Sequence, residues 1–169
     1  MDNTFIECMV KRDDKTMRIV KKVGFGALAL AVNAVAFVLI PNFFSIVLLV
    51  TVLLIFFFWR RIDREYEYIY TDGVIDIDVI YGRSSRKRLL SADAKEFQFI
   101  SWCKGGQFRA QMDASYDKTL DAGRGGLNDD SYIGVVTYRD KTYKLIFEPD
   151  ERIVKALRRY IPRKFEEKP

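Results

Sequence analysis

Residues 23–59 read VGFGALALAVNAVAFVLIPNFFSIVLLVTVLLIFFFW, a stretch of 37 positions without one charged side chain. As a single helix it would extend about 55 Å, whereas the hydrocarbon core of a bilayer is about 30 Å thick. Pro41 and Asn42 divide it, because proline disfavours helix in the residue before it and asparagine favours turns. The stretch therefore predicts a hairpin of two short transmembrane helices, residues 23–40 and 43–59.

Two other interpretations of this stretch fit less well. A cleaved signal peptide is disfavoured because a second, more apolar segment follows the first and no A-x-A site precedes a polar start. A buried helix pair in a soluble protein is disfavoured because neither segment has a polar face. Asn33 is the strongly polar side chain inside a span, and an interhelical hydrogen bond explains it better than a pore or dimer contact.

The basic residues around the stretch predict its orientation. Six Lys and Arg residues lie within residues 1–22, Arg60, Arg61 and Arg64 follow the second span, and the turn has none. Because Lys and Arg favour the cytoplasmic side of a bilayer, both termini are expected in the cytoplasm and only the turn on the far side. The sequence thus predicts a two-span protein of the cell membrane.

Residues 1–22 form a cytoplasmic flank with two open interpretations. Phe5, Ile6, Met9 and Val10 have the spacing of a helical stripe, which predicts a short amphipathic helix on the membrane surface. A disordered basic flank fits the same residues equally well.

The chain changes to a periodicity of two after Arg64, which predicts strands in a cytoplasmic domain over residues 60–169. Residues 65–71 (EYEYIYT) and 74–81 (VIDIDVIY) flank Asp72-Gly73, a strong signal for a two-residue hairpin turn. Further strands are expected at RKRLL, AKEFQFISW, FRAQM, YIGVVTY and TYKLIF (86–90, 94–102, 108–112, 132–138 and 142–147). About seven antiparallel strands are therefore expected.

One helix is expected at residues 149–161. Pro149 suits its first position, Asp150 and Glu151 place acids at its positive end, and Pro162 ends it. Seven strands followed by a C-terminal helix is the element order of a pleckstrin-homology-like (PH-like) barrel. The predicted fold class is a membrane α-hairpin joined to a β-rich domain of this kind.

Catalytic, metal and cofactor sites are not expected. The chain has no histidine, and Cys8 and Cys103 are isolated, so no catalytic triad or zinc-ligand set can be assembled from these residue types. Residues 113–131 (DASYDKTLDAGRGGLNDDS) lack both a phosphate-loop GK[ST] and an EF-hand pattern, and predict a surface loop. Asp76 and Asp78 share a strand face, where solvated carboxylates are commoner than acid–base pairs. A non-enzymatic protein is therefore expected.

Basic residues provide the candidate binding site. Arg83, Arg86, Lys87 and Arg88 lie at a predicted hairpin connection, and Arg158 and Arg159 lie on the C-terminal helix. A domain tethered to an anionic leaflet gains about 1 kcal/mol per basic group near the surface. These residues predict binding to anionic lipid head groups or to a protein partner, with ordinary solvated charge as the alternative. Nucleic acid is not expected, because the tyrosines alternate as core-facing strand residues.

The whole chain resembles a family of uncharacterised bacterial two-span membrane proteins that carry a domain of unknown function. The resemblance rests on TFIECMVKR (4–12), the hairpin, EYEYIYTDGVIDIDVI (65–80), RKRLL, and LIFEPDERIVKALRRYIPRKF (145–165). The layout is also similar to bacterial PH-like proteins in which a two-helix hairpin precedes a β domain. Neither resemblance implies a catalytic residue or a ligand.

The expected function is therefore a membrane-anchored module that binds a protein partner or anionic lipid at the inner surface. The alternative is a structural subunit of a membrane assembly, either with other proteins or as a homo-oligomer, recruited through the hairpin.

Overall fold

The computed structural model describes residues 5–13, 15–82 and 85–169. The chain divides into two compact units. One, here called the β domain, comprises Met1–Asp13, Glu65–Ile80 and Arg86–Pro169. The other, here called the hairpin unit, comprises Asp14–Arg64 and Tyr81–Ser85.

The hairpin unit contains two helices, α1 (Lys15–Leu39) and α2 (Phe44–Ile62), joined by the 3-10 turn η1 (Pro41–Phe43). Both are long and apolar enough to cross a membrane. The predicted break at Pro41 is confirmed, and the helices extend beyond the apolar stretch at its two ends. The Asn33 Nδ2 group donates to the Ala29 carbonyl of its own helix (2.8 Å), so the predicted interhelical hydrogen bond is wrong for this amide group.

The first sheet of the β domain contains β1 (Phe5–Lys11), β2 (Arg64–Thr71), β3 (Val74–Tyr81) and β4 (Ser85–Asp93), in that order. β1 pairs antiparallel with β2 over seven residues, from Phe5↔Thr71 to Lys11↔Glu65. The expectation of a surface helix or a disordered flank is therefore wrong for residues 5–11.

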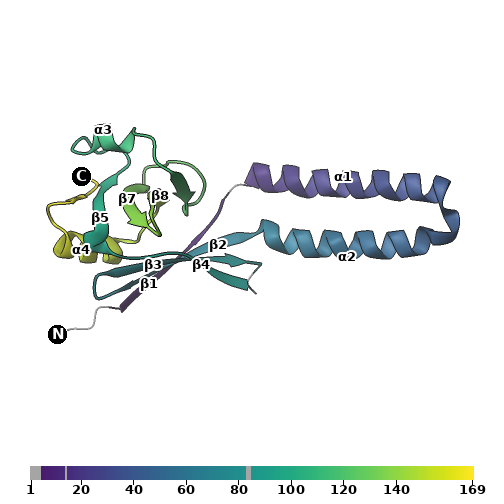
Figure 1. Cartoon of the computed structure of the whole chain (residues 1–169), viewed down its shortest axis with the longest axis horizontal. Coiled ribbons are helices and arrows are strands. Elements are labelled where there is room, and N and C mark those ends of the chain that lie inside the picture. The colour runs from purple at the N-terminus through teal and green to yellow at the C-terminus, as the bar shows by residue number, and fades with distance from the viewer. Residues whose placement is uncertain (1–4, 14, 83–84) are drawn as a thin grey trace. The chain divides into compact units, whose positions relative to one another are not determined.

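Side-chain alternation explains why residues 5–11 form a strand. Ile6, Cys8 and Val10 lie opposite Tyr70, Tyr68 and Tyr66, the buried tyrosines of β2. A period of two thus buries one face of the segment, whereas the helical stripe would have left it on the surface. The helical hairpin is consequently inserted in the chain between β1 and β2, two paired strands of one sheet, as the colours of the chain in Figure 1 show.

The predicted Asp72-Gly73 hairpin turn is confirmed between β2 and β3. Both residues have positive φ angles, 48° and 99°, which a two-residue turn of this class requires. A side chain at Gly73 is also excluded by space, because a Cβ there would lie 2.1 Å from the Tyr160 ring.

The second sheet has the order β6-β8-β7-β5-β9. Its central strands are β5 (Phe97–Trp102), β7 (Tyr132–Tyr138) and β8 (Lys141–Phe147), all antiparallel neighbours. The short strands β6 (Lys118–Asp121) and β9 (Phe165–Glu166) pair in parallel at its two edges. The two sheets have four and five strands and are not closed, so the expected seven-stranded barrel is wrong.

Residues 108–112 do not form the expected strand. Arg109–Met112 is a short helix, α3. Helical spacing places Phe108 and Met112 on one side, where both join the buried cluster that contains Phe99. The Phe108 ring stacks on the Phe99 ring with centroids 4.9 Å apart.

The C-terminal helix is confirmed as α4 (Glu151–Tyr160), slightly shorter than predicted. Asp150 caps it by accepting a hydrogen bond from the Ile153 N–H (2.9 Å), and Ile153 and Leu157 are fully buried. The helix therefore contributes an apolar face to the β-domain core.

Candidate functional site

The predicted basic residues of β4 are bound to buried acids. The Arg86 and Arg88 Nε groups lie 2.6 Å and 2.8 Å from the two carboxylate oxygens of Asp78, whose side chain is 3% exposed. Arg88 also contacts Asp76 (2.9 Å), and Arg86 contacts Glu67. Arg86 and Arg88 are thus counterions of the first sheet, and each keeps about half of its side chain exposed. Arg83 lies outside the described residues.

The acids of this cluster differ in their protonation equilibria. Burial alone would raise the pKa of Asp78, but hydrogen bonds from Arg88 and Arg86 outweigh burial and lower it. Burial raises the pKa of Glu67, and a hydrogen bond with Glu7 raises it further. The face therefore holds one well-neutralised carboxylate and one poorly neutralised one.

The regular alternation of side chains between the two faces of β4 is interrupted within this cluster. Arg86 and Arg88 contact Asp78, and Ser91 Oγ donates to Asp76 (2.6 Å) on the same strand, β3. Residues 88 and 91 therefore face the same side although three positions separate them. Regular alternation cannot place both there, so the sequence pattern alone does not predict the face of the two arginines.

The remaining predicted basic residues are exposed. Lys87 lies on β4 between Arg86 and Arg88, whereas Arg158 and Arg159 lie far along the chain on α4. Arg158 contacts Glu167. Their binding to lipid or to a partner stays a prediction.

A second polar cluster lies at the open end of the hairpin unit. Asp63, directly after α2, receives Arg18 (3.3 Å) and Lys22 (3.5 Å) from α1. Its carbonyl accepts a hydrogen bond from the Gly82 N–H (3.0 Å), and Arg64 lies over the Tyr81 ring. Tyr81 and Gly82 are thus held beside the residues that directly follow α2.

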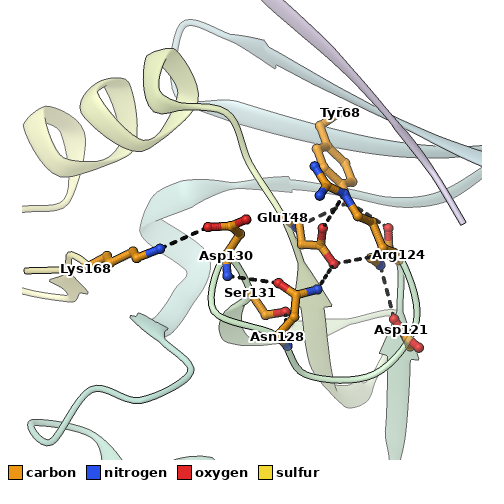
Figure 2. A network of polar contacts seen from close by, with 10 residues as sticks. Tyr68, Asp121, Arg124, Asn128, Asp130, Ser131, Glu148 and Lys168 are labelled. Atoms are coloured by element: carbon orange, nitrogen blue, oxygen red, sulfur yellow. Dashed lines mark hydrogen bonds and ion pairs between the residues drawn. The ribbon is translucent and has the colours of Figure 1, made fainter. Parts of the chain in front are cut away.

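The third cluster surrounds Glu148, a carboxylate with 2% of its side chain exposed. Figure 2 shows Arg124 and Asn128 converging on it. Glu148 Oε1 accepts from the Arg124 N–H (2.8 Å) and from Asn128 Nδ2 (2.7 Å), while Oε2 lies 3.1 Å from Arg124 Nε. The glycine-rich segment around Gly123, expected to be a plain surface loop, therefore folds around a buried acid.

The same loop is attached to the segment that leads into α1. Asp121 receives the Arg12 guanidinium (3.1 Å), and the Asp13 N–H donates to the Arg124 carbonyl (2.8 Å). The Tyr68 hydroxyl donates to the Ala122 carbonyl (2.6 Å). The loop thus connects β1, β2 and β8 within the β domain.

A groove of about 390 Å³, lined by both polar and apolar groups, lies beside this cluster. One wall is Cys8–Val10 of β1, and the other is the segment from Glu148 into the first turn of α4. The remaining lining residues are Arg124, Asp130, Tyr132, Val154, Glu167, Lys168 and Pro169.

The described residues offer little reactive chemistry. Among residues 5–13, 15–82 and 85–169, no group of three or more His, Cys, Asp or Glu side chains could hold a metal ion. Burial raises the pKa of both the Cys8 and the Cys103 thiols, which disfavours the nucleophilic thiolate.

Comparison with known sequences places the whole arrangement in one family. The sequence model of the family described as "Bacterial PH-like domain (DUF6106)" matches residues 2–167. The chain belongs to this family. Neither a curated protein nor a solved structure matches it. The matched range of this PH-like protein begins before β1 and ends after β9, so it includes the helical hairpin as well as both sheets.

Proposed function

We propose that this PH-like protein is a membrane-anchored, non-enzymatic module that binds a protein partner at the cytoplasmic surface of the cell membrane. The observation that carries the proposal is the position of the hairpin between β1 and β2. PH-like domains are generally non-enzymatic, which supports a binding role over a catalytic one.

The exposure of the helices supports insertion of the hairpin into a bilayer. Large apolar side chains of both helices are open to the surroundings, for example Leu30 and Val38, each 75% exposed, and Phe56, 61% exposed. In water this surface would drive aggregation, whereas in hydrocarbon it is favourable. Lipid is thus the environment that suits α1 and α2.

The sheet supports a topology with both flanks on one side. Lys11 and Glu65 are paired neighbours in β1 and β2, so the chain leaves and re-enters the β domain at one place. Two paired strands of one sheet must lie on the same side of a bilayer. The segment between them must therefore cross the bilayer an even number of times. The basic flanks favour the cytoplasm as that side.

Anionic lipid is a second candidate ligand, favoured by the cluster at the open end of the hairpin unit. Arg18 and Lys22 lie within two turns of Val23, where the uncharged stretch begins, and Asp63 neutralises only one of their two charges. The exposed Lys87, Arg158 and Arg159 would add to this attraction. Arg86 and Arg88 contribute less, because both already neutralise Asp78.

The anchoring proposal is tested by cysteine labelling of the full chain in cells. An Asn42→Cys variant should react with a membrane-impermeant maleimide from outside, whereas a Lys87→Cys variant should react only after lysis. Cys8 and Cys103 are replaced by serine in both variants. Release of the protein by alkaline carbonate, or labelling of residue 87 from outside, would contradict the proposal.

Partner binding is tested by crosslinking and co-purification of the tagged full chain. A matched chain keeps α1 and α2 but carries Val10→Asp, which disrupts β1. Partners that require intact β1 support binding through the β domain. Partners retained equally by both chains would instead support a structural subunit recruited through its hairpin.

The lipid candidate is tested in nanodiscs with and without phosphatidylglycerol. Hydrogen exchange near Lys87 and α4 should slow in the anionic discs, and the effect should weaken in high salt. The triple variant Lys87→Ala, Arg158→Ala and Arg159→Ala should lose this protection. Equal exchange in both kinds of disc would exclude lipid docking of the domain.

A further inference from the structure

β1 is the edge strand of the first sheet and is poorly protected against pairing. The sheet order is β1-β2-β3-β4, and the register with β2 is one-to-one from Phe5 to Lys11. Natural edge strands are usually short, bulged, charged, interrupted by proline or covered. This one carries charge at Glu7 and Lys11, but it has seven residues, no proline and no register shift.

The side chains of this edge are also unusual for a surface. Phe5 and Met9 are 62% and 56% exposed. Both point to the outer face, since Ile6, Cys8 and Val10 turn inward against the tyrosines of β2. A second strand beside β1 would cover apolar surface that is now open to water, which is favourable at about 25 cal/mol per Å².

The groove beside β1 provides room for the inward side chains of such a strand. Its wall at Cys8, Met9 and Val10 belongs to the edge, and Tyr132 and Val154 add apolar surface. The opposite wall is the start of α4, whose Arg152 Nη2 donates to the Glu7 carbonyl of β1 (3.1 Å). This guanidinium sits on a side chain that is 68% exposed, so an incoming backbone N–H can displace it at small cost.

The charges of the groove decide what kind of strand fits. The lining includes two cations, Arg124 and Lys168, and five carboxylates, which belong to Asp130, Glu148, Asp150, Glu151 and Glu167. The buried Glu148 is paired with Arg124, whose side chain is 59% exposed. Asp130 is paired with Lys168 (3.0 Å), and Asp150 with Arg152 (2.7 Å). The pairs of Glu151 with Lys155 and of Glu167 with Arg158 involve cation side chains that are 61% and 65% exposed, and such surface pairs are exchanged readily.

The outer face of the same edge carries two neighbouring acids, Glu7 of β1 and the nearly buried Glu67 of β2, and Arg86 contacts Glu67. Burial and the neighbouring Glu7 raise the pKa of Glu67. A cation placed beside Glu7 would relieve the repulsion between the two carboxylates. An anionic lipid surface would increase it, so lipid is a poor occupant for this edge.

We infer that the β1 edge binds, by strand addition, an extended segment of a partner protein in which apolar residues alternate with Lys or Arg. The inference rests on the proposed function and specifies the partner chemistry. Backbone hydrogen bonds to β1 would give affinity, and the carboxylates of the groove and of Glu7 would select basic residues. The cytoplasmic flanks of other membrane proteins are one source of basic residues close to this domain, because they are enriched in Lys and Arg.

The test uses the full chain in nanodiscs of phosphatidylcholine and fluorescent eight-residue peptides. One peptide alternates valine with lysine, and its counterpart alternates valine with glutamate. The lysine peptide should bind at least tenfold more tightly by fluorescence anisotropy, and less tightly as salt rises. Equal binding of both peptides, or binding of neither, would overturn the inference.

Strand addition is tested by modifying the peptide, so that the protein itself is unchanged. Two versions of the lysine peptide carry N-methyl groups on alternate residues, in the two possible phases. One phase should lose binding, because its methyl groups replace the N–H donors that face β1. Full binding by both versions would exclude strand addition.

A charge-neutralising variant locates the contact. Glu151→Gln combined with Glu167→Gln should weaken the lysine peptide about fivefold, since both residues line the groove and neither caps α4. The matched control is Glu96→Gln with Asp113→Asn, two exposed acids outside the groove lining, which should bind as the parent does. If the control weakens binding equally, the groove is not the site. A failed peptide test together with partners that still require intact β1 would refute this inference and leave the proposed function standing.

Discussion

The hairpin is inserted in the chain between the paired strands β1 and β2. This arrangement predicts that the β domain needs residues 5–13 for its stability. Two soluble chains test this. The first is residues 64–169 alone. The second joins residues 5–13 to residues 64–169 through one glycine, which leaves a four-residue loop (Arg12, Asp13, Gly, Arg64) between the paired residues Lys11 and Glu65. Loops of this length commonly close β-hairpins.

The expected difference in the free energy of unfolding between the two chains follows from the apolar surface that β1 buries. Val10 is 6% exposed, and Ile6 and Cys8 are half-buried, so their burial contributes about 4 kcal/mol. Uncovering Tyr66, Tyr68 and Tyr70 in the shorter chain costs a similar amount. Ordering seven residues opposes these gains by about 1 kcal/mol per residue, and the ladder hydrogen bonds offset part of that. We expect the joined chain to be more stable by about 3 kcal/mol, a large share of the 5–15 kcal/mol typical of a domain.

Urea unfolding gives the measurement. Both chains lack Trp59, so Trp102 on β5 is the fluorescent reporter. With a slope of about 1.5 kcal/mol per molar urea, the midpoints should differ by about 2 M. Val10→Asp in the joined chain is the control and should lower its midpoint toward that of the shorter chain. Equal midpoints for the joined and shorter chains would refute the pairing of β1 with β2 and, with it, the insertion of the hairpin in the sheet.

Three further predictions concern charged residues. Asp78→Asn should lower stability at pH 7 by about 2 kcal/mol, since it weakens the pairing of Arg86 and Arg88. Because the folded pKa of Asp78 is lowered, the difference from the parent should shrink as pH falls below about 4, measured by urea midpoints. Glu67→Gln should change stability in the opposite direction. Because the folded pKa of Glu67 is raised, the variant should be more stable than the parent at pH 7. This gain in stability should vanish as pH falls through the raised pKa. A lower midpoint for Glu67→Gln at pH 7 would contradict this assignment. Glu148→Gln should lower stability by about 2 kcal/mol and accelerate hydrogen exchange at the Arg124 amide, whereas Glu96→Gln on the surface should do neither.

The parts of the fold that depend on local sequence could be predicted. The hairpin break at Pro41, the turn at Asp72-Gly73 and the capped helix α4 each carry their signal within a few residues. β1 was missed because its partner strand is more than fifty positions away. Phe5, Ile6, Met9 and Val10 also fit a helical period as well as Ile6, Cys8 and Val10 fit a strand period. Only the pairing with the β2 tyrosines decides between them.

The candidate sites could be predicted less well, because each is assembled over long sequence distances. The basic residues of β4 were recognised, but their partners Asp78 and Glu67 were not, and the change of face between Arg88 and Ser91 has no local signal. Glu148 is one acid between a strand and Pro149, and nothing nearby in the sequence marks it as the residue around which the glycine-rich loop folds. Phe108 and Met112 are four positions apart and would share one face in a strand as well as in a helix, so this spacing did not reveal that residues 109–112 form α3.

The insertion of the hairpin between β1 and β2 also fixes the order of events during synthesis. The ribosome makes β1 first, and β2 follows only after residues 12–64, which take about 3–10 s at 5–20 residues per second. During that delay β1 has no partner, and the sheet closes only when β2 emerges on the same side of the membrane. If the hairpin crossed the bilayer only once, β1 and β2 would lie on opposite sides of the membrane. Folding of the β domain would then fail, so under the proposed topology the first sheet can form only when both ends of the hairpin lie on the same side of the membrane.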